Sequence, residues 1–132
     1  MRHLLNASAF CLLILAGCTE KEPASFRLSG EALCDGQPIP YGEVLFSPDS
    51  AKGNKGPQGF ANVRDGKYDT NSPDGKGIAG GPTVVRLTGF SAPGGKLLCE
   101  YEYPVDLPAQ NGTLKVEAPA KGNAKQPANK DI

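Results

Sequence analysis

Apolar residues along this chain come in short runs, which are separated by turns rich in glycine, proline, asparagine and aspartate. In residues 26–32 apolar and polar side chains alternate with period two, as in a strand with one buried face. Val44 with Phe46, and Ala61 with Val63, are expected to point into a core. The same reasoning predicts six further strands, at residues 41–46, 59–63, 67–70, 83–90, 97–105 and 112–118.

Glycine and proline are unusually frequent, with 17 Gly and 12 Pro among 132 residues. Both residues destabilise helices, and beyond the N-terminal apolar run no long segment has the 3.6-residue period of a helix. Seven short strands with regular turn signals predict an all-β fold, specifically a seven-stranded antiparallel β-sandwich over residues 26–118. Residues 119–132 hold one large apolar residue, Ile132, and are predicted to be a disordered tail.

The N-terminus has the pattern of a targeting segment. Arg2 precedes a mostly apolar run, residues 4–16, which is too short to span a membrane. The run ends in Leu15-Ala16-Gly17-Cys18, which resembles the lipobox of bacterial lipoprotein signal peptides. An ordinary signal peptide followed by a buried cysteine is the alternative.

The lipobox resemblance implies where the protein resides. Residues 1–17 would be a cleaved signal peptide, Cys18 the lipidated residue, and residues 18–25 a polar tether. Residue 19 is Thr rather than Asp, which in this family favours the outer membrane over the inner one. The expected location is therefore the cell envelope, lipid-anchored on the periplasmic or surface side.

Two cysteines remain once Cys11 leaves with the signal peptide and Cys18 carries lipid. Outside the cytoplasm an even pair favours a disulfide, here between Cys34 and Cys99. Such a bridge would close a loop of about 65 residues, which stabilises a domain by roughly 4 kcal/mol in the chain-entropy model. Two separate buried thiols are the alternative.

Residues 28–46 resemble the pattern V-x-G-x-V-x-x-D-G-x-P-(V/I/L)-x-x-(G/A)-x-V-x-F of carboxypeptidase regulatory-like domains. Asp65-Gly66-Lys67-Tyr68 is similar to their later D-G-x-Y hairpin. The resemblance covers about residues 26–118 and implies a transthyretin-like sandwich with an Ig-like Greek key. Planctomycete-type bacteria contain many lipobox proteins with this single domain. The family often has an aromatic residue where Cys34 stands, and this departure fits a pairing with Cys99.

Catalytic chemistry has little support in the sequence. The only histidine, His3, belongs to the predicted signal peptide, so a catalytic triad lacks its base. The net charge of zero gives no basic footprint for nucleic acid. The glycine-rich residues 75–81 lack the following helix of a phosphate-binding loop. We therefore expect no enzyme activity, no cofactor and no nucleic-acid partner.

Two weaker candidates remain. Glu100 and Glu102 share one strand face about 7 Å apart, which could serve acid–base chemistry or simply face solvent. Tyr101 and Tyr103 alternate with them and are expected in the core or at a sandwich edge rather than in a ligand platform. Oxygen-bearing side chains also cluster in one stretch, as a weak calcium site or as plain turn residues: Asp65, Asp69, Asn71 and Asp74.

The leading functional hypothesis is a non-catalytic, lipid-anchored binding or structural module. It would contact an envelope protein or polysaccharide through the loops 47–58 and 71–82. The alternatives are a small hydrolase that uses carboxylates and a solute-binding or carrier lipoprotein.

Overall fold

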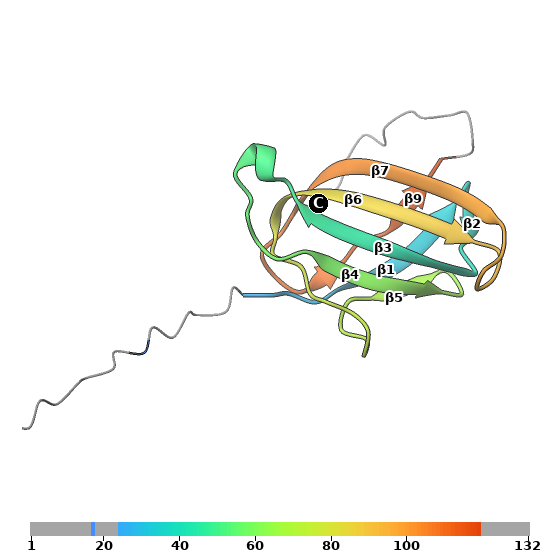
Figure 1. Ribbon diagram of the computed structural model, residues 1–132, viewed down its shortest axis with the longest axis horizontal. Coiled ribbons are helices and arrows are strands. Elements are labelled where there is room, and N and C mark those ends of the chain that lie inside the picture. The colour runs from blue at the N-terminus through green and yellow to red at the C-terminus, as the bar shows by residue number, and fades with distance from the viewer. Residues whose placement is uncertain (1–16, 18–23, 120–132) are drawn as a thin grey trace, which may run out of the picture.

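In the computed structural model, which describes Gly17 and residues 24–119, strands begin and end close to the predicted turns (Figure 1). The elements are β1 (Leu28–Cys34), β2 (Gln37–Pro38), β3 (Tyr41–Pro48), the 3-10 turn η1 (Ser50–Lys52), β4 (Gly59–Arg64), β5 (Lys67–Asp69), β6 (Gly81–Phe90), β7 (Leu97–Leu107), β8 (Gly112–Thr113) and β9 (Val116–Ala118). No helix in this part of the chain is long and apolar enough to cross a membrane.

The strands form one curled sheet in the order β2-β1-β5-β4-β3-β6-β7, with β8 and β9 added to β1. Every pairing along that order is antiparallel. In Figure 1 the strands β4, β3, β6 and β7 form the front, while β1, β2 and β9 lie behind them. The fold is therefore all-β, as predicted, and has the form of a half-barrel.

The number of strands differs from the seven predicted, because nine are present in the described residues. The predicted strand at 112–118 is split into β8 and β9, which both pair with β1 in parallel. The short β2 follows the Asp35-Gly36 turn and pairs back on β1. Such two- and three-residue strands are set by their partners across the sheet rather than by a pattern of their own.

The two Asp-Gly turns bring distant hairpins together. Asp35 and Gly36 have φ of 49° and 74°, and Asp65 and Gly66 have 50° and 74°. Positive φ at both central residues is the requirement of a type I′ hairpin turn. A side chain at Gly66 would overlap Pro38, whose Cβ lies 2.6 Å from the position of the missing atom. The hairpin β1–β2 can therefore pack directly against the turn between β4 and β5.

The core lies between the front strands and the strands behind them. Val44, Phe46, Ala61 and Val63 are buried, which confirms the predicted inward faces. Residues from nearly every strand complete the core: Leu28, Ala32, Ile39, Tyr68, Ile78, Val85, Leu87, Tyr103, Val105, Leu107, Val116 and Ala118.

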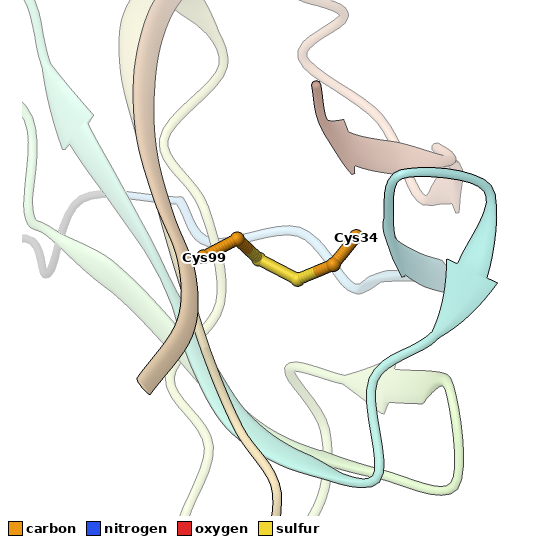
Figure 2. Close-up of a disulfide and its surroundings, with 2 residues drawn as sticks. All are labelled: Cys34 and Cys99. Carbon is orange, nitrogen blue, oxygen red and sulfur yellow. A yellow bond between two sulfur atoms is a disulfide. The ribbon is translucent and has the colours of Figure 1, made fainter. Parts of the chain in front are cut away.

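A disulfide joins Cys34 at the end of β1 to Cys99 near the start of β7, with 6.1 Å between the Cα atoms (Figure 2). Gly89 on β6 leaves room for it, because a Cβ there would lie 2.9 Å from the Cys34 Sγ and 3.1 Å from the Cys99 Sγ. The bridge links β1, at the back of the fold, to β7, the outermost of the front strands.

Candidate functional site

A hollow of about 500 Å³ lies over the outward-facing side chains of β1, β4 and β5. Because side chains alternate along a strand, the residues between the core positions point to this outer face. The lining residues are Ser29, Gly30, Glu31, Asn62, Arg64, Lys67, Tyr68, Asp69 and Ser72. Ligand sites in proteins commonly have volumes of about 300–1,000 Å³.

The charges around this hollow are balanced. Arg64 and Lys67 provide two cations, and Glu31 and Asp69 provide two anions. The Arg64 guanidinium lies 3.9 Å from the centre of the Tyr41 ring and donates a 2.7 Å hydrogen bond to the carbonyl of Val63. Together with the neutral serine and asparagine side chains, the lining offers hydrogen-bond donors and acceptors without a net charge.

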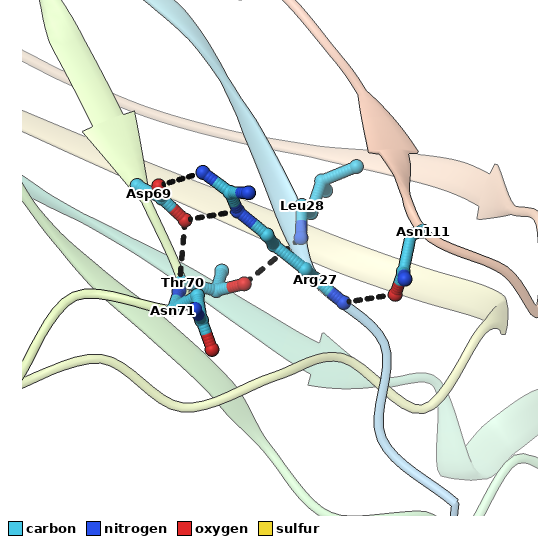
Figure 3. A network of polar contacts seen from close by, with 6 residues as sticks. All are labelled: Arg27, Leu28, Asp69, Thr70, Asn71 and Asn111. Carbon is cyan, nitrogen blue, oxygen red and sulfur yellow. Dashed lines mark hydrogen bonds and ion pairs between the residues drawn. The ribbon is translucent and has the colours of Figure 1, made fainter.

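At the edge of the hollow, Asp69 forms an ion pair with Arg27 (Figure 3). The Arg27 Nε and Nη2 atoms donate to the two carboxylate oxygens of Asp69 at 3.0 and 2.5 Å. The backbone N–H of Asn71 donates to the same carboxylate at 2.9 Å. The hydrogen bond from Arg27, the hydrogen bond from Asn71 and the positive charge of Arg27 hold the pKa of Asp69 below its usual value, and Asp69 in turn raises the pKa of Arg27.

A second hollow of about 280 Å³ lies on the other side of this ion pair. Its lining is Ser25, Phe26, Arg27, Thr70, Asn71, Gly77 and Asn111. Asn111 accepts a hydrogen bond of 2.8 Å from the Arg27 backbone N–H, and Thr70 accepts one of 2.9 Å from the Leu28 backbone N–H (Figure 3). Asp69 borders the first hollow and Arg27 the second, so their ion pair lies between the two.

The two loops that the sequence singled out meet at the end of the fold where residue 24 enters. The Asn54 side chain donates to the carbonyls of Gly80 and Pro82 at 2.8 and 2.7 Å, which joins the loops. Phe26 and Ile78 form a bridge beside them. Loop 71–82 borders both hollows, whereas loop 47–58 borders neither of them.

The four weak calcium candidates are not gathered around one point. Asp65 occupies the turn before β5, while Asp69 ends β5 with its carboxylate engaged by Arg27. Asn71 uses its backbone N–H on Asp69, and Asp74 is exposed in the following loop. Between residues 24 and 119 no three side chains of His, Cys, Asp or Glu are close enough together to hold a metal ion.

Glu100 and Glu102 lie on the solvent face of β7, with side chains 51% and 57% exposed. Each lies beside Arg86 of β6, at 3.7 and 3.5 Å, and neither borders the two hollows. Tyr103 is buried and Tyr101 half-buried, and their rings stack 5.5 Å apart. Burial, followed by the nearby Tyr101 and Glu117, raises the pKa of Tyr103 to about 12. These tyrosines therefore pack on the inner face rather than forming a platform.

Sequence reasoning did not find Arg27 as part of a site. Arg27 and Asp69 are 42 positions apart, and only the pairing of Ser29 with Asp69 brings them to the same corner. Their outward positions on expected strands were the only available signal. The predicted signal peptide apart from Gly17, the lipidation residue Cys18 and the tail after Pro119 lie outside the described residues.

Comparison of the chain with protein-family models, curated proteins and solved structures finds no match.

Proposed function

We propose that this protein is a non-catalytic, lipid-anchored binding module of the bacterial cell envelope. The Leu15-to-Cys18 lipobox supports the anchor, and the disulfide between Cys34 and Cys99 fits an oxidising compartment. In this proposal β2, β9 and the second half of β1 are the second sheet of a transthyretin-like sandwich, and the resemblance of residues 28–46 to carboxypeptidase regulatory-like domains supports that view.

The larger hollow is the observation that carries the binding role. Two cations and two anions stand around a lining whose exposed surface is mostly apolar. The hollow therefore suits an uncharged ligand that has both apolar faces and hydrogen-bonding groups, as a sugar ring does. The hollow lies open on a sheet face rather than inside the fold, so a long ligand can extend beyond it. A segment of an envelope polysaccharide has these properties, and we assign this ligand class to the site.

Binding can be tested with the purified protein and neutral envelope oligosaccharides in calorimetric titrations. Asn62→Ala and Lys67→Ala remove hydrogen-bonding groups from the lining, and each is expected to weaken binding about five- to thirtyfold. Lys96→Ala, in the exposed turn between β6 and β7, is the matched control and should bind like the unmodified chain. Equal affinity for all three variants would exclude the hollow as the binding site.

The anchor requires a separate test in a bacterial host. Labelled palmitate should enter the unmodified protein and not Cys18→Ala, and the variant should leave the membrane fraction. Cys34→Ala is the control, because that cysteine is in the disulfide and should not affect labelling. Labelling that persists in Cys18→Ala would contradict the lipid anchor without affecting the binding proposal.

A further inference from the structure

Strand β7 presents a long unpaired edge. It stands at the end of the strand order and pairs with β6 from Leu107 back to Leu97. No other strand in residues 24–119 pairs with it, and its 11 residues make it the longest described strand. An edge of this kind exposes a row of backbone N–H and C=O groups that can accept a further strand.

The backbone groups that face outward can be identified from one hydrogen bond. The carbonyl of Pro82 accepts from the backbone N–H of Asp49, 2.9 Å away, so Pro82 directs its backbone toward the β3 side of β6. Asp106 is the partner of Pro82 on β7, and it must direct its own backbone away from β6. Because this direction alternates along a strand, Pro104, Glu102 and Glu100 also face the open edge. Pro104 has no N–H to donate, which agrees with this assignment.

The same residues carry the side chains of the outer face at this edge. Glu100, Glu102, Pro104 and Asp106 are all exposed, so three of these four positions are acidic. Arg86 lies between the two glutamates at 3.5–3.7 Å, and both carboxylates stay about half exposed. A strand added here would place its residues directly opposite these carboxylates, about 5.5 Å away from Cα to Cα.

We propose that the β7 edge binds an extended basic segment of another protein, which adds to the sheet as an antiparallel strand. The segment carries Lys or Arg opposite Glu100, Glu102 and Asp106, so the basic residues alternate with apolar ones. Opposite charges paired directly across strands are favourable, which makes the carboxylates the selectors of the partner. The proposal is independent of the polysaccharide site, because none of these residues borders either hollow.

A second copy of this chain does not fit the edge. Antiparallel pairing of β7 with itself about Glu102 would place Glu102 opposite Glu102 of the other copy. Pairing centred on Tyr103 would place Glu100 opposite Asp106. Like charges directly opposite are unfavourable, so the same carboxylates that attract a basic strand oppose self-association. The lysines after Pro119, at 121, 125 and 130, are spaced by four and five residues, so no register of that segment sets all three opposite Glu100, Glu102 and Asp106, which are spaced by two and four.

The probe for this proposal is a synthetic peptide, Lys-Val-Ser-Thr-Lys-Val-Lys, matched to residues 106 down to 100. Titrated against the full purified chain at low salt, it should shift the backbone NMR signals of β7. It should also slow hydrogen exchange of the Glu100, Glu102 and Asp106 amides at least about tenfold. A peptide with Glu in place of each Lys should bind at least about tenfold more weakly. The same loss is expected for the Lys peptide when the backbone amides that would hydrogen-bond to β7 are N-methylated.

Two protein variants locate the site. Glu102→Gln should weaken binding of the Lys peptide about threefold, because one opposite-charge pair is lost. Glu43→Gln removes an exposed carboxylate from β3, two strands in from the edge, and should bind like the unmodified chain. Equal binding of the N-methylated peptide, unprotected edge amides, or a dimer of the chain paired through β7 would each overturn the proposal.

Discussion

The strands β1 and β7 differ in how far their backbone hydrogen-bonding groups are paired with neighbouring strands. β1 has partners on both sides: β5 and β2 along the strand order, and β8 and β9 added in parallel. Among the residues that the structure describes, β7 pairs with β6 alone, and its outward residues from 100 to 106 are acidic or proline. Backbone hydrogen-bonding groups at a sheet edge must be paired, covered or made unattractive to other edges. β1 is thus enclosed by strands of its own chain on both sides, whereas the outer side of β7 has no partner among the described residues and carries acidic side chains.

The disulfide ties these two regions together, and its removal should have the largest effect. Replacing Cys34 and Cys99 together with Ala is expected to lower the free energy of unfolding by about 4 kcal/mol, because the unfolded chain regains the freedom of a loop whose ends are separated by 65 positions. Urea denaturation measures the loss, and reduction of the unmodified protein should reproduce most of it. An unchanged midpoint in both cases would mean that the two strands are held together without the bridge.

The same Leu→Ala truncation should cost much more stability in β1 than in β7. Leu28→Ala in β1 removes a side chain that is 1% exposed and is expected to cost about 3 kcal/mol. Leu98→Ala in β7, where the leucine is 40% exposed, should change stability by less than about 0.5 kcal/mol. Comparable losses in denaturation would show that the β7 edge is buried in solution, which would also contradict the proposed docking surface.

The burial of Tyr103 on the inner face of β7 should make the protein less stable at alkaline pH. Burial raises the pKa of Tyr103 to about 12, whereas an exposed tyrosine ionises near pH 10. A raised pKa in the folded state means that the stabilising contribution is complete below pH 10 and declines as pH rises toward 12. Tyr103→Phe should flatten this decline in denaturation experiments at several pH values. A decline of the same steepness in the variant would assign it to other groups, foremost Tyr68, whose pKa is also raised by burial.

The smallest effect is expected at the exposed ion pair beside β1. The pKa of Asp69 lies below its usual value because Arg27 donates to its carboxylate, so Arg27→Gln should raise it in an NMR titration. The pair's contribution to stability is present above the normal aspartate pKa and is lost as pH falls through the lowered one. Near neutral pH the variant should unfold close to the unmodified midpoint, because both partners face solvent. An Asp69 pKa that does not move would show that Asn71 alone holds the carboxylate.

The direction of a side chain can be predicted from the sequence where it depends only on the residue's own strand. Val44 and Phe46 alternate with polar neighbours, so their inward direction follows from strand geometry alone. The Asp-Gly pairs at 35–36 and 65–66 likewise favour left-handed hairpin turns and adopt them, whereas Asp74-Gly75, within a longer loop, has no positive φ. Glu100 and Glu102 were placed on one face correctly, although their shared neighbour Arg86 belongs to another strand.

The candidate site was less accessible to sequence reasoning. Loop 71–82 does border both hollows, but the rest of the lining comes from β1, β4 and β5, whose outward side chains look like any solvated strand face. The polar neighbours of Asp69 along the chain indicate a weak calcium ligand. Its actual partner, Arg27, comes from the other side of a strand pairing that no local pattern encodes.

Local chemistry in the sequence thus determined the all-β character, the turns and most strand positions, and the cysteine count favoured a bridge between Cys34 and Cys99. These features depend on period, backbone preference and composition, which neighbouring residues largely settle among themselves. The tertiary structure decided that β8 and β9 pair with β1 in parallel while β7 has no second partner in residues 24–119, and that Arg27 meets Asp69 between two hollows. Those outcomes depend on which strands become neighbours, and that choice is made by the packing of the whole core.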